Sequence, residues 1–268
     1  MSDLFAKRLR RAAELIDAWP HAGQILRFYQ AVLSHQRRVH ESLCELPSRD
    51  PEGFDLFLLR PFLAPTLDLL EAEAPEELAR QATRLKSRDY AEWLDFLTIA
   101  RSGGDRAVQE GDPLDEPASW WVAKILLQPY LFSLANGRPQ MPPSSDQPRR
   151  CPFCKAYPLV SLLREDRTAE TVRRSLICSL CSHEWDYARV LCPNCGEERP
   201  EKLPRYAAQE IPWMRVEACD SCGKYLKSVD LTLNVDAEPV VDELASTPLD
   251  VIAGEHGYVK LTPNLAGI

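Results

Sequence analysis

The sequence lacks any uncharged apolar run of about 18 residues, so no segment is suited to span a membrane. Its start, "MSDLFAKRLRRAAELIDAW", scatters charge along its length and reads neither as a secretory signal nor as a twin-arginine signal. A Gly-rich phosphate loop is also missing. The lack of a membrane span and of export signals predicts a cytoplasmic protein without membrane insertion.

Concentrated positive charge is missing as well. The net charge is −8, and it is spread evenly. Residues 1–142 hold 17 basic and 21 acidic side chains, and residues 143–268 hold 15 and 19. A nucleic-acid binder usually needs a concentrated basic face, so nucleic acid is not the expected partner.

No set of residues in the sequence is convincing as a catalytic site. Cys44 lies in an apolar helical stretch, where a cysteine is more often part of the core than a nucleophile. His183 follows Cys181 by two residues and is better explained as a surface histidine in a turn than as a metal ligand. Asp242 and Glu243 are explained equally well as partner contacts or as solvated acids at a helix start.

The sequence does contain nine cysteines, and eight of them form four C-x2-C pairs within 72 residues. The pairs are Cys151 and Cys154, Cys178 and Cys181, Cys192 and Cys195, and Cys219 and Cys222. Disulfide frameworks rarely consist of uniform C-x2-C units, and a thioredoxin-like site normally has one such pair. The pattern therefore favours metal binding over disulfides or dithiol catalysis.

The four pairs repeat with a fixed offset of 41 residues, which indicates an internal duplication. Pro152 matches Pro193, and Arg174 matches Arg215, at the same offset. A duplicated unit must have been able to fold alone. We therefore expect two sequential four-cysteine sites, one in each repeat, rather than a cross-braced arrangement.

Four thiolates form a tetrahedral cage that suits zinc or iron, and the residues alone do not separate the two metals. Each knuckle favours a left-handed residue after its second cysteine, a position that glycine fills without strain. Gly196 and Gly223 occupy it in the second repeat, whereas Lys155 and Ser182 occupy it in the first. A left-handed residue other than glycine costs about 1 kcal/mol or somewhat more, so the first site should be the less ideal one.

The rest of the chain predicts an α+β, multidomain protein. Apolar stripes such as Phe5, Leu9, Ala12, Ile16 and Trp19 predict helices through the N-terminal half. The expected organisation is a helical domain over 1–136, a Pro-rich linker over 137–150, four-cysteine ribbons over 151–190 and 191–236, and a short helical tail over 237–268. The ribbons should be small β-rich modules of the rubredoxin or zinc-ribbon type.

The chain resembles the FdhE family of formate dehydrogenase accessory proteins. The resemblance rests on the pairs "CPFC", "CSLC", "CPNC" and "CDSC" at these spacings behind a helical half, and on the tail "DAEPVVDELASTPLDVIAGEHGYVKLTPNLAG". It implies a non-enzymatic chaperone for the maturation of respiratory formate dehydrogenases, which binds their catalytic subunit in the cytoplasm before export. It also implies bound iron, with zinc as the alternative.

Carried onto this sequence, the resemblance assigns the eight paired cysteines to two metals. The first metal would take Cys151, Cys154, Cys178 and Cys181, and the second would take Cys192, Cys195, Cys219 and Cys222. The role would be that of a metal-stabilised scaffold for the client, with redox activity at an iron site as an extension. The alternative is a zinc-ribbon protein that binds nucleic acid or the transcription machinery.

Overall fold

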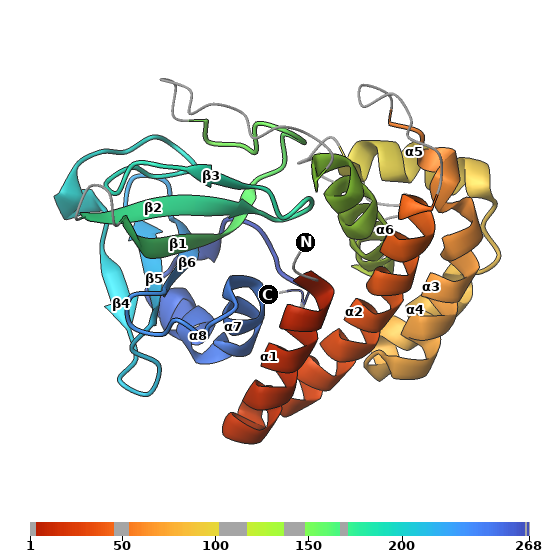
Figure 1. Ribbon diagram of the computed structural model, residues 1–268, viewed down its shortest axis with the longest axis horizontal. Coiled ribbons are helices and arrows are strands. Elements are labelled where there is room, and N and C mark those ends of the chain that lie inside the picture. The colour runs from red at the N-terminus through yellow and green to blue at the C-terminus, as the bar shows by residue number, and fades with distance from the viewer. Residues whose placement is uncertain are drawn as a thin grey trace.

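The computed structural model describes residues 4–45, 54–101, 117–136, 148–166, 171–265 and 267. Helices from the N-terminal half and a β-sheet from the C-terminal half lie side by side (Figure 1). This arrangement confirms the expected α+β fold class. Most of the predicted linker, at 137–147, lies outside the described residues, and the domain boundaries stay predictions. None of the helices in the described ranges is long and apolar enough to cross a membrane.

The helical part is held together by apolar side chains that recur at helical spacing. Its helices are α1 (Leu4–Ala18), α2 (Gly23–Cys44), α3 (Arg60–Glu73), α4 (Glu76–Leu85), α5 (Tyr90–Arg101) and α6 (Pro117–Asn136). Short 3-10 turns, η1 (Pro20–Ala22) and η2 (Leu56–Leu59), precede α2 and α3. In α6 the side chains of Val122, Ile125 and Leu126 are fully buried. The helix lies against α2, α3, α4 and α5 and is the centre of this part.

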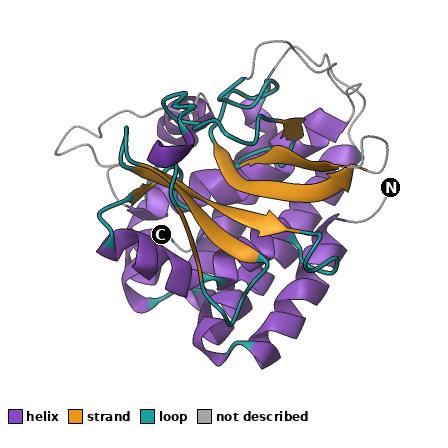
Figure 2. Cartoon of the chain, turned by 90° about the vertical axis from the view of Figure 1, so that its left-hand side faces the viewer, coloured by secondary structure: helices purple, strands orange, loops and turns teal. Residues whose placement is uncertain are grey.

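The C-terminal half forms one sheet in the order β3-β2-β1-β6-β5-β4, with β7 paired to β6. The strands are β1 (Pro158–Asp166), β2 (Thr171–Cys178), β3 (Glu184–Asp186), β4 (Arg205–Ala207), β5 (Met214–Cys219), β6 (Lys224–Asp230) and β7 (Val259–Lys260). A third 3-10 turn, η3 (Pro200–Lys202), precedes β4. Figure 2 shows these strands as a twisted layer. β1 and β6 are almost continuously buried, as expected for central strands.

The internal duplication is visible in the sheet. Shifted by 41 residues, β2 overlaps β5 and β3 overlaps β6. Each repeat is a three-stranded antiparallel ribbon, and the ribbons join through parallel pairing of β1 with β6, from Val160 opposite Lys227 to Leu163 opposite Asp230. The equivalent arginines Arg174 and Arg215 meet on one carboxylate, that of Glu217, at 2.7 and 3.1 Å. The two ribbons therefore share a sheet and an ion-pair cluster.

Two helices at the C-terminal end, α7 (Pro239–Ala245) and α8 (Thr247–Glu255), pack against the sheet. α7 lies against β1 and β6, and α8 lies against β4 and β5. The other side of α7 faces α1, so this short helix stands between the sheet and the helical part (Figure 1). The two helices confirm the helical character predicted for the tail.

Candidate metal centres

The first candidate metal centre gathers Cys151, Cys154, Cys178 and Cys181. Cys151 and Cys154 lie in the turn before β1, whereas Cys178 ends β2 and Cys181 belongs to the turn that leads to β3. The Sγ atoms of Cys154 and Cys178 are 3.3 Å apart, and those of Cys151 and Cys181 are 3.6 Å apart. All four residues are buried.

The second candidate centre gathers Cys192, Cys195, Cys219 and Cys222. The first pair lies in the loop after β3, and the second pair forms the hairpin turn between β5 and β6. Sγ distances are 3.8 Å between Cys192 and Cys222 and 3.6 Å between Cys195 and Cys219. The thiols thus gather in the sequential arrangement, one set in each repeat, and not in the cross-braced one.

These distances fit one metal ion in each cluster. Four sulfurs placed about 2.3 Å from a metal at tetrahedral angles lie about 3.8 Å from one another. In both clusters the four Sγ atoms all lie within 4.8 Å of one another. Each cluster could therefore close around zinc or iron with little movement of its side chains.

The backbone of the knuckles adopts the conformation expected for metal binding. The residue after the second cysteine of each pair has a positive φ: 65° at Lys155, 57° at Ser182, 82° at Gly196 and 67° at Gly223. Backbone N–H groups also point at sulfur, as at Leu180, whose N–H donates to Cys178 Sγ at 3.4 Å. The left-handed positions expected from the sequence are confirmed, including the two that are not glycine.

The loss of stability caused by a left-handed residue other than glycine can be measured separately from steric clashes at Gly196. A Cβ there would meet no atom within 4 Å, so Gly196→Ala introduces no clash and should cost about 1 kcal/mol through its φ alone. The matched control is Gly254→Ala in α8, which also has open space but no positive φ. Gly254→Ala should raise the free energy of unfolding by up to about 1 kcal/mol, because alanine has a higher helix propensity than glycine. Urea unfolding of both metal-loaded variants checks this, and midpoint shifts of equal sign would contradict it.

The pKa values of the thiols in the first cluster also indicate that a bound cation is needed for all four to ionise. Hydrogen bonds from Cys154, Cys178 and Cys181 lower the pKa of Cys151. Burial raises the pKa of Cys178, and the hydrogen bond with Cys151 raises that of Cys181. Ionisation of Cys151 is therefore favoured, whereas ionisation of Cys178 and Cys181 is opposed. A divalent metal ion would supply the positive charge that allows all four to become thiolates.

The two clusters differ in their exposure to solvent. In the second cluster Cys195 is exposed and Cys222 is half-buried, whereas every cysteine of the first is buried. The first cluster is thus enclosed by protein, and the second is open on one side.

Two further expectations from the sequence concern single residues. Cys44, expected in the core, is exposed at the end of α2, and that expectation was wrong. Its Sγ lies 3.6 Å from Nε2 of His40, one turn earlier in the helix. His183 is half-buried in the turn after Cys181, and its ring stacks on that of Trp185. It is not part of the group of ligand atoms at the first cluster.

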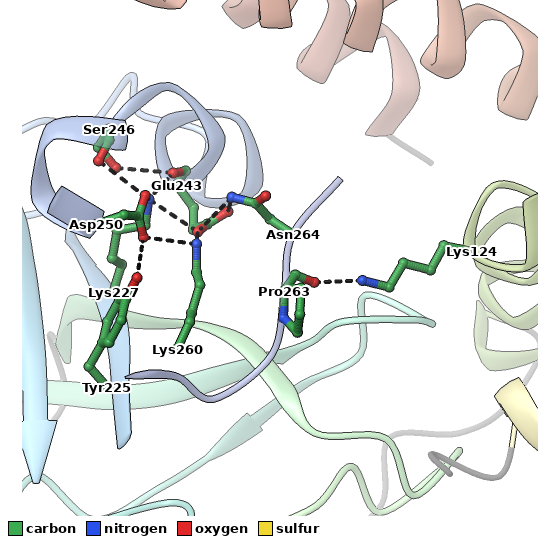
Figure 3. Close-up of polar contacts among 9 residues, drawn as sticks. All are labelled: Lys124, Tyr225, Lys227, Glu243, Ser246, Asp250, Lys260, Pro263 and Asn264. Atoms are coloured by element: carbon green, nitrogen blue, oxygen red, sulfur yellow. Dashed lines mark hydrogen bonds and ion pairs between the residues drawn. The ribbon is translucent and has the colours of Figure 1, made fainter. Parts of the chain in front are cut away.

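The largest departure from the sequence analysis is a buried ionic network in the tail. Lys227 of β6 lies 2.6 Å from Asp250 and 3.2 Å from Glu243 (Figure 3). Lys260 of β7 lies 2.5 Å from Glu243 and 3.0 Å from Asp250. The side chains of Lys227 and Glu243 have no exposed surface. Tyr225 adds a hydrogen bond to Asp250 at 2.7 Å.

Asp242 is buried as well, and it connects the tail with the helical part. Arg11 of α1 donates to both carboxylate oxygens of Asp242, at 2.7 and 2.9 Å, and Trp213 donates to one of them at 3.0 Å. Nearby, Arg8 donates to Glu238 at 3.2 Å. Neither Asp242 nor Glu243 is a solvated acid or an exposed partner contact. Both readings were wrong, because these acids have buried cationic partners far away in the sequence.

Comparisons with known proteins agree with this architecture. Residues 150–189 match the family model "FdhE, central domain", and residues 190–266 match "FdhE, C-terminal domain". Protein FdhE of Escherichia coli O1:K1 / APEC is 32% identical, over 98% of this chain and 88% of its own. The FdhE homolog of Aquifex aeolicus is 25% identical, over 97% and 94%.

A solved structure extends the comparison to three dimensions. The crystal structure of the FdhE protein from Pseudomonas aeruginosa superposes with a TM-score of 0.75 at 27% identity. The match covers 99% of this chain and 96% of that one. Together with the two four-cysteine clusters, these likenesses show that the chain belongs to the FdhE family.

Proposed function

We propose that the protein is a non-enzymatic accessory protein for the maturation of formate dehydrogenase and acts in the cytoplasm. In this proposal it binds the immature catalytic subunit, and its two metal-stabilised ribbons form the rigid platform for that contact. The observation that carries the proposal is the pair of four-cysteine clusters in a chain of the FdhE family. Closed four-cysteine sites are usually structural, which fits a scaffold better than a catalyst.

The eight cysteines of the two clusters are the proposed metal ligands. Iron is the favoured metal because the family resemblance implies it, and zinc is the alternative. Both ions suit an all-sulfur cage of this size. Because unfolded ribbons present no formed site, metal binding and ribbon folding should be one equilibrium.

A redox role is a more specific proposal, and it requires iron as the bound metal. The open second cluster, with Cys195 exposed, is the better placed of the two for electron exchange with a bound protein. An optical spectrum of the purified protein that changes on reduction would support the role. A spectroscopically silent protein containing zinc would contradict it.

A capture experiment tests the scaffold proposal. The full chain serves as bait in extracts of cells that make formate dehydrogenase, and metal content is measured on the same preparations. Wild type should enrich the catalytic subunit, whereas Cys192→Ala should lose one metal ion, disorder the second ribbon and capture at least about tenfold less client. Cys44→Ala is the matched control, since it removes an exposed thiol outside both clusters.

The outcomes separate the alternatives. Absence of the catalytic subunit from the wild-type bait would contradict the maturation role. Retained capture by metal-depleted Cys192→Ala would contradict the ribbons as the platform. Enrichment of RNA polymerase, or tight and salt-sensitive binding of DNA or RNA, would favour the zinc-ribbon alternative over this proposal.

A further inference from the structure

A cleft with an excess of positive charge opens beside the second cluster. The cleft is shallow, and Cys192 and Cys219 form part of its wall. The charged residues that line it are Arg174, Arg189, Arg205, Lys224 and Glu217. Four cations thus face one carboxylate, on a chain whose net charge is −8.

Of the four cations, Arg174 pairs with Glu217, and Arg205 lies opposite Glu217 in the pairing of β4 with β5. The guanidinium of Arg174 is used internally, because it donates to the carbonyl oxygen of Ala188 at 2.8 Å and pairs with Glu217 at 2.7 Å. Arg189 and Arg205 are exposed, and Lys224 is half-buried. Within the described part of the chain none of the last three forms an ion pair. We call Arg189, Arg205 and Lys224 the basic rim.

Neutralising the metal cluster does not account for the whole rim. Four thiolates around one divalent ion carry a charge of about −2, and nearby cations would offset it. The charged residues lining the cleft have an excess of three positive charges. The exposed Arg149 adds another close by, because its guanidinium donates to the carbonyl oxygen of Asn194 at 2.9 Å. Positive charge therefore remains in the cleft, which borders the Cys192 and Cys219 side of the cluster and not the exposed Cys195.

We infer that the basic rim is the docking site for an acidic segment of the client protein, an inference that rests on the proposed function. Arginine guanidinium groups bind carboxylates through two parallel hydrogen bonds, and the exposed Arg189 and Arg205 present two such groups to an approaching acidic segment. A nucleic acid is the poorer occupant, because the rim is local and the rest of this acidic chain repels a phosphate backbone. Docking there would place the client beside the second cluster, on the side formed by Cys192 and Cys219.

The test removes the charge of the rim and leaves the cysteines unchanged. The bait is the full metal-loaded chain as wild type, as Arg189→Gln/Arg205→Gln/Lys224→Gln, or as a matched control. The control, Lys7→Gln/Arg10→Gln/Arg27→Gln, removes the same charge from exposed residues of α1 and α2. We expect the rim variant to capture at least about tenfold less catalytic subunit than the other two baits. Wild-type capture should also weaken as salt increases.

Further readouts distinguish docking from support of the metal site. The rim variant should retain wild-type metal content and its thermal midpoint. Arg189→Lys/Arg205→Lys, which keeps the charge but loses the paired hydrogen bonds, should capture more client than the rim variant and less than wild type. Equal capture by the rim variant and wild type, or loss of metal from the rim variant, would overturn the inference while the proposed function stands. Failure of wild type to capture the client would overturn both. Binding of a 30-mer DNA that is lost in the rim variant would assign the rim to phosphate instead.

Discussion

A chain with Cys151→Ser and Cys178→Ser is expected to keep one metal ion, whereas Cys151→Ser with Cys192→Ser should remove both. The first pair of changes lies within one cluster, and the second pair divides between the two clusters. Loss of a structural metal removes a contribution on the order of 10 kcal/mol, comparable with the whole stability of a small domain. Each cluster that loses its metal should therefore leave its own ribbon unfolded.

Metal analysis per chain and far-ultraviolet circular dichroism check this result. The helical signal of α1 to α6 should persist in both variants, because α6 buries apolar side chains against the neighbouring helices. The opposite metal counts, none for the first variant and one for the second, would indicate cross-bracing and contradict the sequential clusters. A single Cys44→Ser change should leave both ions in place, since this thiol lies outside the clusters.

Lys227→Met is expected to destabilise the protein by about 3–5 kcal/mol, although it affects neither cluster directly. The change leaves Glu243 and Asp250 buried with one cation, Lys260, where two had balanced them. An uncompensated buried carboxylate costs far more than the methionine side chain gains by packing. Because Lys227 lies on β6, which pairs with β1, the loss should loosen both ribbons from α7 and α8.

Urea unfolding measures the loss of stability in Lys227→Met, and a variant that removes an exposed ion pair serves as the control. In the control, Arg80→Met, the ion pair with Glu77 has both side chains more than 60% exposed, so the cost should be about 0.5 kcal/mol or less. Combining Lys227→Met with Glu243→Gln should cost about 1–3 kcal/mol less than the sum of the single changes, because the lost charges compensate each other. Additive costs, or a single-variant loss as small as that of Arg80→Met, would show that the network is not a coupled unit.

Several features of this protein were determined by sequence alone because they are local or periodic. The apolar stripe of α1 follows the helical period, so the helix could be predicted without knowledge of its partners. The 41-residue offset predicted which cysteines gather, because a repeated unit carries its own ligands. The left-handed backbone at Lys155 and Ser182 follows from knuckle geometry even where glycine is missing.

Only the tertiary structure decided how these parts meet. Nothing local distinguishes a buried Glu243 from a solvated one, because the partners that make its burial tolerable, Lys227 and Lys260, lie on β6 and β7. The same holds for Asp242, whose partner Arg11 is 231 residues away. The pairing of β1 with β6 joins two repeats that could each have stood alone. Sequence spacing determined the metal clusters, whereas long-range charge pairing and strand pairing determined how the ribbons, tail and helices form one body.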